Sequence, residues 1–216
     1  MKTFFILSLL VLSQAVSVYS QSREDREEAR FTAYVVAGAN FSQIDGDAAW
    51  GYTKVGFNGG ARGGINFGEK MELCTEILFS QKGAANLPRN SQNFSSYTIH
   101  LDYVEVPLLF YYKDWDAFTK DNEMYKRLML GGGLSYSRLL NTNLTGTLSH
   151  PMGIEEAYTK NDLMFIIDAN VFFLKNWGLN IRWSRSLTTI YNDEQPGDRP
   201  DYAINRSIIC RLVYKF

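Results

Sequence analysis

The stretch Val55–Phe67, "VGFNGGARGGINF", has three interpretations: a phosphate-binding loop, a flexible linker or a β-strand that needs glycine. Its odd positions are apolar or small, and its even positions are polar or small. Such alternation indicates a strand, whereas a phosphate-binding loop follows a short strand and opens a helix. The next residues, "GEK", begin no helical pattern. We therefore predict a β-strand with Arg62 on its polar face.

The same alternation recurs along the chain and predicts eight strands. The other seven lie near residues 31–41, 71–82, 99–112, 128–137, 163–173, 179–184 and 207–216. In the strand near 99–112 the apolar set changes phase, which predicts a bulge at Asp102 or Tyr103. Connections after the second and sixth strands are tight, and the one at 113–127 is expected to hold a helical turn. Those after the first, third, fifth and seventh strands are polar and mostly long.

This arrangement predicts an all-β fold, an eight-stranded antiparallel up-and-down transmembrane β-barrel with short periplasmic turns and long extracellular loops. A soluble barrel of the lipocalin kind would reverse the faces. Three features favour the membrane barrel: charges at mid-strand on the polar faces, a final Phe216 at the end of an alternating strand, and aromatic residues near the strand ends. The predicted periplasmic aromatic girdle comprises Phe31, Phe67, Phe110, Tyr112, Phe173, Tyr214 and Phe216.

The N-terminal residues predict export. Residues 1–20 carry one lysine, a short apolar run and small residues before Gln21, as a secretory signal peptide does. Residues 21–29 form a short charged periplasmic segment, and 30–216 form the barrel domain. No cysteine follows the apolar run at the cleavage site, which disfavours a lipoprotein, and no later run has the 18 or so apolar residues of a transmembrane helix.

The polar faces supply a nearly balanced set of charges that we expect to form a network inside the barrel. Its members are Arg62, Glu72, Glu76, Lys82, Glu105, Asp168, Arg182, Arg211 and Lys215. Eight strands leave an interior that side chains just fill, so a packed polar plug is favoured over a conducting pore.

Four quoted stretches resemble a known family. "GANFSQIDGD" (38–47), "GYTKVGFNGG" (51–60), "FSQKGA" (79–84) and "LDYVEVPLL" (101–109) are similar to the PorT-like outer-membrane β-barrel family of Gram-negative bacteria. The resemblance spans the mature chain and implies a monomeric eight-stranded barrel. The member that gives the family its name is tied to type IX secretion, a role that a shared fold alone does not transfer.

Catalytic and metal chemistry have little support. The only histidines are His100 and His150, and no fixed spacing ties either to a serine nucleophile, so a lipid A-modifying hydrolase or acyltransferase is a third choice. Acidic stretches at 45–47 and 192–201 match no calcium loop. We expect no metal, no cofactor and, because Cys74 and Cys210 lie on opposite faces of the wall, no disulfide.

Three arginines fall on outward parity at the extracellular strand ends: Arg138, Arg185 and Arg206. A guanidinium group suits phosphate oxygens, so these side chains are candidate contacts for lipopolysaccharide, with strand-end fraying as the alternative. A net charge of -1 argues against nucleic acid.

The sequence thus predicts a non-enzymatic outer-membrane barrel that acts through its extracellular loops or as a partner in an envelope complex. Its expected contacts are outer-membrane lipids, lipopolysaccharide and, during biogenesis, the barrel-insertion machinery. An accessory role in type IX-like secretion is the alternative.

Overall fold

The computed structural model describes residues 29–46, 51–86, 97–146, 155–191 and 203–216. The predicted signal peptide, all but the last residue of segment 21–29, His150 and the acidic stretch 192–201 lie outside them. The elements are β1 (Phe31–Asp45), β2 (Lys54–Phe67), β3 (Met71–Asn86), β4 (Tyr97–Phe118), β5 (Met124–Gly146), the 3-10 helix η2 (Glu155–Ala157), β6 (Asn161–Phe172), β7 (Trp177–Ser186) and β8 (Ile204–Lys215). Within the described ranges, none of the helical structure is long and apolar enough to cross a membrane.

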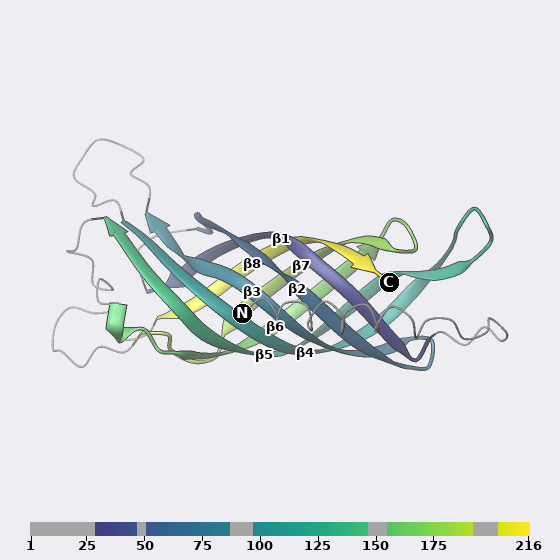
Figure 1. Cartoon of the computed structure of the whole chain (residues 1–216), viewed down its shortest axis with the longest axis horizontal. Helices are drawn as coiled ribbons and strands as arrows, with labels where there is room; N and C mark the ends of the chain where they lie inside the picture. Colours follow the sequence, from purple (N-terminus) through teal and green to yellow (C-terminus); the bar gives the residue numbers. More distant parts are fainter. Residues whose placement is uncertain (1–28, 47–50, 87–96, 147–154, 192–202) are drawn as a thin grey trace, which may run out of the picture.

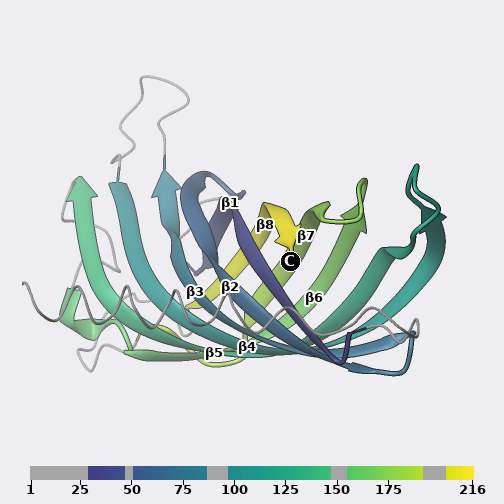
Figure 2. The same ribbon diagram turned by 45° about the vertical axis from the view of Figure 1, so that its right-hand side comes forward.

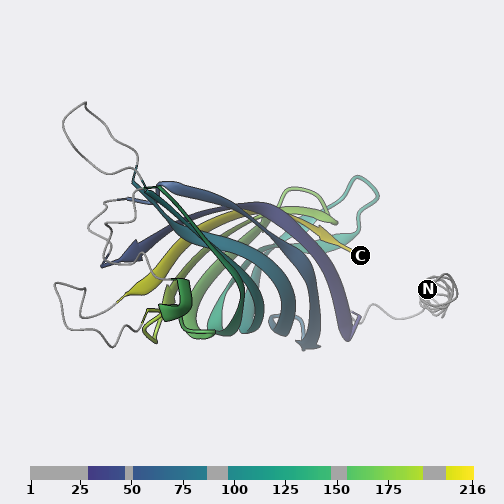
Figure 3. The ribbon, with the colours of Figure 1, turned by 60° about the vertical axis from the view of Figure 1, so that its left-hand side comes forward.

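The eight strands form a closed barrel in which each is antiparallel to its sequence neighbours and β8 pairs with β1 (Figure 1). The connections 68–70, 119–123 and 173–176 lie at the same end as the C-terminus, which we call the turn end (Figure 3). At the opposite end, which we call the loop end, lie the strand ends Asp45, Lys54, Asn86, Tyr97, Gly146, Asn161, Ser186 and Ile204. The predicted fold is confirmed.

The faces are those of a membrane barrel. Ile77 and Leu179 on the outer surface are 66 % and 56 % exposed, whereas Glu76 and Arg182, on the same two strands, are at most 1 % exposed. The charged side chains of these strands therefore lie inside, where they share the interior with buried apolar side chains, and the exposed apolar side chains cover the outside. The lipocalin alternative, with the opposite arrangement, is wrong.

The helical turn expected within 113–127 is absent, and that prediction is wrong. β4 and β5 continue as a hairpin past the ends of β3 and β6, closed by the turn at 119–123 (Figure 2). Alternation is interrupted at Trp115, which has a φ of 61°, and pairing resumes with Asp116 opposite Lys126. The sequence pattern therefore stops before the strands do.

The bulge lies on a different strand from the one predicted. The β4–β5 register shifts between Asp102 and Tyr103, but Tyr103 pairs with Leu139 and Asp102 with Asn141, so Leu140 of β5 is the extra residue. β4 keeps one phase from Tyr97 to Lys113, with Ile99 and Leu101 buried inside. The change in its apolar pattern reflects a change in the interior, from polar at mid-barrel to apolar at the loop end.

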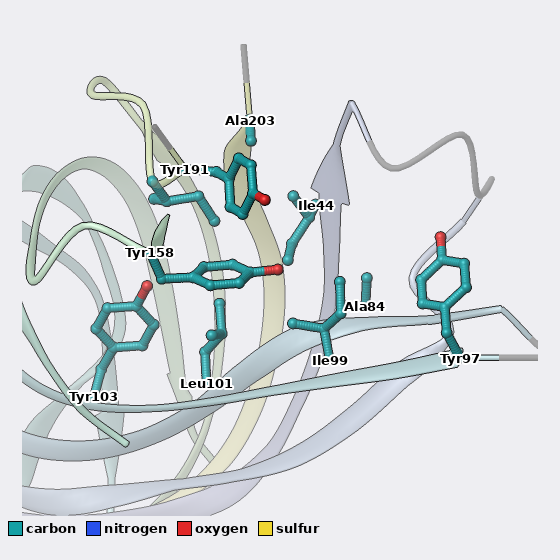
Figure 4. Packing of buried hydrophobic residues seen from close by; sticks show 10 residues of the cluster. Ile44, Ala84, Tyr97, Ile99, Leu101, Tyr103, Tyr158, Tyr191 and Ala203 are labelled. Atoms are coloured by element: carbon teal, nitrogen blue, oxygen red, sulfur yellow. The ribbon is translucent and has the colours of Figure 1, made fainter. Parts of the chain in front are cut away.

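Those inward apolar residues form a cluster that we call the apolar cap (Figure 4). Tyr158 and Tyr191, from the connections before β6 and after β7, form a bridge and meet edge to face with ring centroids 5.0 Å apart. Around them lie Ile44, Ala84, Tyr97, Ile99, Leu101, Tyr103, Ile190 and Ala203. Apolar burial of this kind holds the described ends of two loop-end connections against the barrel interior.

Candidate functional site

Five charged side chains meet at mid-barrel and form what we call the central cluster: Arg62, Glu76, Asp168, Arg182 and Arg211. The strand register builds it, because Arg62 lies opposite Glu76 on β2–β3 and Asp168 lies opposite Arg182 on β6–β7. All five side chains have 0 % exposure.

Glu76 and Asp168 share the three guanidinium groups. Arg62 Nε donates to Glu76 Oε1 at 2.6 Å, and Arg182 Nη1 donates to Glu76 Oε2 at 2.8 Å. Arg182 Nε donates to Asp168 Oδ2 at 2.6 Å, so Arg182 joins the two carboxylates across the lumen. Buried charges of both signs held this closely stabilise one another only while every partner is present.

Three asparagines complete the cluster, and none of them is among the predicted network residues. Arg211 donates to Asn180 Oδ1 at 2.8 Å and to Asn58 Oδ1 at 3.1 Å, and Arg62 donates to Asn170 Oδ1 at 3.2 Å. The three asparagines carry no charge, so the charge pattern of the strands did not identify them. Each of them occupies an inward-facing position of the alternating pattern on a predicted strand, and that position is the signal that could have identified them.

A second polar layer lies between the central cluster and the apolar cap. Lys82 forms an ion pair with Glu105 from β4. Asp162, also missed from the sequence, accepts hydrogen bonds from Ser186 at 2.7 Å and Asn205 at 3.1 Å. These residues come from β3, β4 and β6–β8, so this layer too extends across the lumen.

Nearer the turn end, Glu72 and Lys215 occupy positions apart from the central cluster. Glu72 is buried and accepts hydrogen bonds from the hydroxyls of Thr32 and Tyr34, the latter at 2.9 Å. Lys215 is half-buried, with its ammonium 6.0 Å from the centroid of the Tyr34 ring. The nine predicted network residues therefore divide among several levels of the lumen.

A cavity of about 440 Å³ opens at the turn end, and we call it the turn-end cavity. Four lysines line it: Lys113, Lys126, Lys175 and Lys215. Lys113 is buried and donates to Asn66 Oδ1 at 3.0 Å; the sequence analysis missed it because β4 was ended too early. Phe31, Phe172 and Phe216 also contribute to the lining.

The three candidate lipopolysaccharide contacts lie on the outer surface near the loop end. Arg185 and Arg206 are direct partners in the β7–β8 register, and Arg206 pairs with Asp45 at 2.6 Å. Arg138 donates to Asn161 Oδ1 at 2.6 Å. Two arginines thus occupy directly opposite positions on one strand pair, and Asp45 pairs with the second of them.

The predicted girdle residues lie outside the barrel. Six of them, all except the half-buried Tyr214, are 42–68 % exposed. Tyr214 stacks edge to face between Trp177 and Phe216, with ring centroids 4.9 and 5.0 Å away. The rings of Trp115 and Phe118 on the projecting hairpin are also exposed, and they were not predicted.

The remaining candidates are placed as follows. His100 is exposed on β4. Cys74 is buried inside and Cys210 is exposed outside, and both are free, as their parity predicted. In the part of the chain that the structure describes, no three histidine, cysteine, aspartate or glutamate side chains gather as a metal site would require.

A search of curated proteins found no match. Among solved structures, the attachment invasion locus protein Ail of Yersinia pestis is similar, with 11 % identity over 87 % of this chain and 100 % of Ail, at a TM-score of 0.48. Neisserial surface protein A has 11 % identity over 85 % of this chain and 97 % of its own, at a TM-score of 0.49. OprG of Pseudomonas aeruginosa has 11 % identity over 88 % of this chain and 97 % of its own, at a TM-score of 0.41. None of these similarities bears on ligand or activity.

The family model described as "Outer membrane protein beta-barrel domain" matches residues 19–192, which is most of the chain. Its name agrees with the closed eight-stranded barrel, the apolar outer surface and the polar interior. The chain therefore belongs to the outer membrane protein beta-barrel domain family and is an outer-membrane protein of the Gram-negative envelope.

Proposed function

We propose that this protein is a non-enzymatic, non-conducting outer-membrane barrel that acts through its extracellular side or as a partner in an envelope complex. The observation that carries the proposal is the central cluster, whose five charged side chains have 0 % exposure at mid-barrel. A water-filled pore would leave such side chains hydrated.

Single-channel recording in planar bilayers tests this closure. The full-length mature protein should stay near the baseline conductance, because no continuous water path crosses the cluster. Replacing one opposed pair, Arg62→Ser with Glu76→Ser, removes one cation and one anion and should raise the conductance several-fold. The matched control is the pair Asp116→Ser with Lys126→Ser, which joins the two strands of the projecting hairpin at the turn end and makes no contact with the central cluster. Steady large conductance from the unaltered protein would overturn the proposal.

We further propose that Arg138, Arg185 and Arg206 bind lipopolysaccharide phosphate at the outer headgroup boundary. Like charges directly opposite on neighbouring strands destabilise a sheet. Asp45 pairs with Arg206, and an anion from the surrounding lipid would offset the repulsion that Arg185 adds. Arginine forks pair well with phosphate oxygens.

Lipopolysaccharide retained on purification measures this contact. The double variant Arg185→Glu, Arg206→Glu should retain several-fold less than the unaltered protein. A control with the same charge change at the turn end, Lys70→Glu with Lys120→Glu, should retain the normal amount. Equal retention in all three proteins contradicts the assignment.

Deletion of the gene separates the proposed role from its alternatives. The proposal expects unchanged lipid A and an unchanged set of secreted proteins, with loss of a surface or complex phenotype. Altered secreted proteins would instead identify a secretion accessory, and altered lipid A acylation would identify an enzyme.

A further inference from the structure

A groove of about 320 Å³ lies on the outer surface of the wall, across strands β1 to β4. We call it the outer groove, and it is lined by six outward-facing residues: Phe31, Gly63, Ile65, Leu73, Thr75 and Leu108. The strand register explains its position. Gly63 and Thr75 are direct partners, and the larger Ile65 and Leu73 are direct partners in the next outward row. Small side chains beside a row of large ones leave an apolar hollow in the surface.

The described side chains leave the hollow at Gly63 open. A Cβ added to this glycine would meet no atom within 4 Å. Gly59 faces outward on the same strand, but there an added Cβ would lie 2.6 Å from Phe57 Cζ, so the ring of Phe57 already covers that glycine. Apolar atoms that have no partner on one side lose dispersion contacts. The hollow at Gly63 therefore favours an apolar occupant that fits it.

The medium around the outer groove is lipid. Ile65 and Leu108 on its border are exposed and continue into the apolar outer surface of the barrel. In an outer-membrane protein that surface meets hydrocarbon. Lipid tails are as apolar as leucine, so van der Waals packing decides which contacts are preferred there. An acyl chain that lies in the groove gains such packing, and the surrounding bilayer supplies it.

A cation lies at the turn-end margin of the same groove. The guanidinium carbon of Arg30 is 5.9 Å from the centroid of the Phe31 ring, and that ring lines the groove. Arg30 is exposed, and its carbonyl oxygen accepts a hydrogen bond from the backbone amide of Asn66 at 2.8 Å. Guanidinium groups form strong hydrogen bonds with phosphate oxygens. One lipid can therefore place an acyl chain in the groove and its phosphate against Arg30.

We propose that the outer groove binds one acyl chain of a phospholipid from the leaflet at the turn end, with the phosphate of that phospholipid on Arg30. The arginines proposed to bind lipopolysaccharide lie near the loop end, which assigns lipopolysaccharide to the opposite leaflet. Gly63 keeps the groove open, and Phe31 joins the groove to the phosphate contact. The site lies outside the lumen, so closure at the central cluster has no bearing on it.

Native mass spectrometry in detergent counts the lipid molecules that remain on the full-length mature protein. Titrated with phosphatidylethanolamine, the unaltered protein should retain a single molecule. Gly63→Leu should retain several-fold less, because the leucine side chain fills the groove. The matched control Ala169→Leu adds the same side chain to the outer face of β6, opposite Leu130 and Ile181, and should retain the normal amount. Equal retention by all three proteins overturns the proposal.

A lipid without phosphate separates the two contacts. Arg30→Gln should weaken retention of phosphatidylethanolamine several-fold and leave retention of dioleoylglycerol unchanged, whereas Gly63→Leu should weaken both. Retention of lipid A in place of phosphatidylethanolamine, lost on Gly63→Leu, would overturn the choice of lipid. A protein dimer that dissociates on Gly63→Leu would overturn the proposal as well, because a second copy of the chain would then cover the groove.

Photo-cross-linking gives a measurement in the unaltered protein that needs no substitution at Gly63. Phosphatidylethanolamine with a diazirine on its acyl chain is added at a limiting ratio in detergent, and the labelled residues are identified by mass spectrometry. Labelling of Thr75 and Leu108 should exceed that of Leu130 and Ile181 several-fold. The latter two are exposed on β5 and β7, outside the groove. Equal labelling of the two sets would show that the lipid has no preferred position and would overturn the site.

Discussion

Gly63 and Gly64 are neighbours in the sequence and face opposite sides of the wall. A Cβ added to Gly64 would lie 2.1 Å from Glu72 Oε1 and 2.4 Å from Thr32 Oγ1. A Cβ added to Gly63 would meet no atom within 4 Å. The inward glycine therefore makes room for a buried carboxylate and its hydroxyl partner, whereas the outward one leaves space on the lipid-facing surface.

This contrast predicts opposite outcomes for two single-methyl substitutions. Gly64→Ala should destabilise the barrel by about 1–3 kcal/mol through overpacking. Gly63→Ala should be neutral or stabilising by roughly 0.5 kcal/mol, because alanine loses less backbone entropy in a strand. Urea unfolding in lipid vesicles, followed by tryptophan fluorescence, measures both. Equal changes in the free energy of unfolding for the two variants would contradict this prediction, since Glu72 would then accommodate the added methyl group without loss of stability.

Glu76 forms ion pairs with all three arginines of the central cluster, whereas Asp168 pairs with two of them. Glu76→Gln would leave three buried guanidinium groups with Asp168 alone, and we expect about 3–5 kcal/mol of destabilisation. Asp116→Asn, which breaks a pair whose carboxylate is half exposed, should cost no more than about 1 kcal/mol. The same unfolding measurement compares them, and similar losses from both variants would contradict the role given to burial.

At the scale of the strands, parity in the sequence was sufficient to predict the fold and the direction of most interior side chains. It was insufficient where a strand departs from simple alternation. Trp115 has a positive φ that interrupts the alternation, so the pattern did not predict that β4 continues beyond it. The apolar residues Ile99 and Leu101 were interpreted as a change of phase in β4, because the sequence did not predict the apolar cap in which they lie. Contacts between distant strands, such as Arg182 with Glu76, depend on barrel closure and are not encoded in local periodicity.

The bulge on β5 predicts which single-residue deletion the strand tolerates. Removing Leu140 leaves Leu139 and Leu144 facing the interior, because the bulge inserts one extra outward residue. Removing Asn143 instead turns Leu144 outward, since facing alternates at every residue. With both native cysteines replaced by serine and Leu144→Cys added, maleimide should label the Asn143 deletion several-fold faster than the Leu140 deletion. Equal labelling would contradict the assignment of Leu140 as the extra residue.

For the whole molecule, closure rests on the β1–β8 pairing, and a native cysteine lies in it. Ala39 is the direct partner of Cys210. Opposed residues of antiparallel strands have Cα atoms about 4.5–5.5 Å apart, within the range that a disulfide spans. Ala39→Cys should therefore form a disulfide with Cys210 on mild oxidation of the folded protein. The disulfide should raise the temperature at which the barrel unfolds, measured by its migration on a denaturing gel after heating, and a reductant should reverse the effect.

The neighbouring substitution Ala37→Cys provides the control, because its partner is Leu212. It should form no bond with Cys210 under the same conditions. A failure of Ala39→Cys to form the bond in folded protein would contradict the register of the closing pair.

The same pairing has a consequence for how the chain reaches its native state. Tyr34 pairs with Lys215, so the contacts that close the ring join the first strand to the last. Contacts of such high sequence separation form late and slow the folding of a chain. Until they form, β1 and β8 each present an unpaired edge that invites association with other strands. A nascent chain of this protein is therefore most prone to aggregation just before the ring closes, and assistance during assembly would matter most at that step.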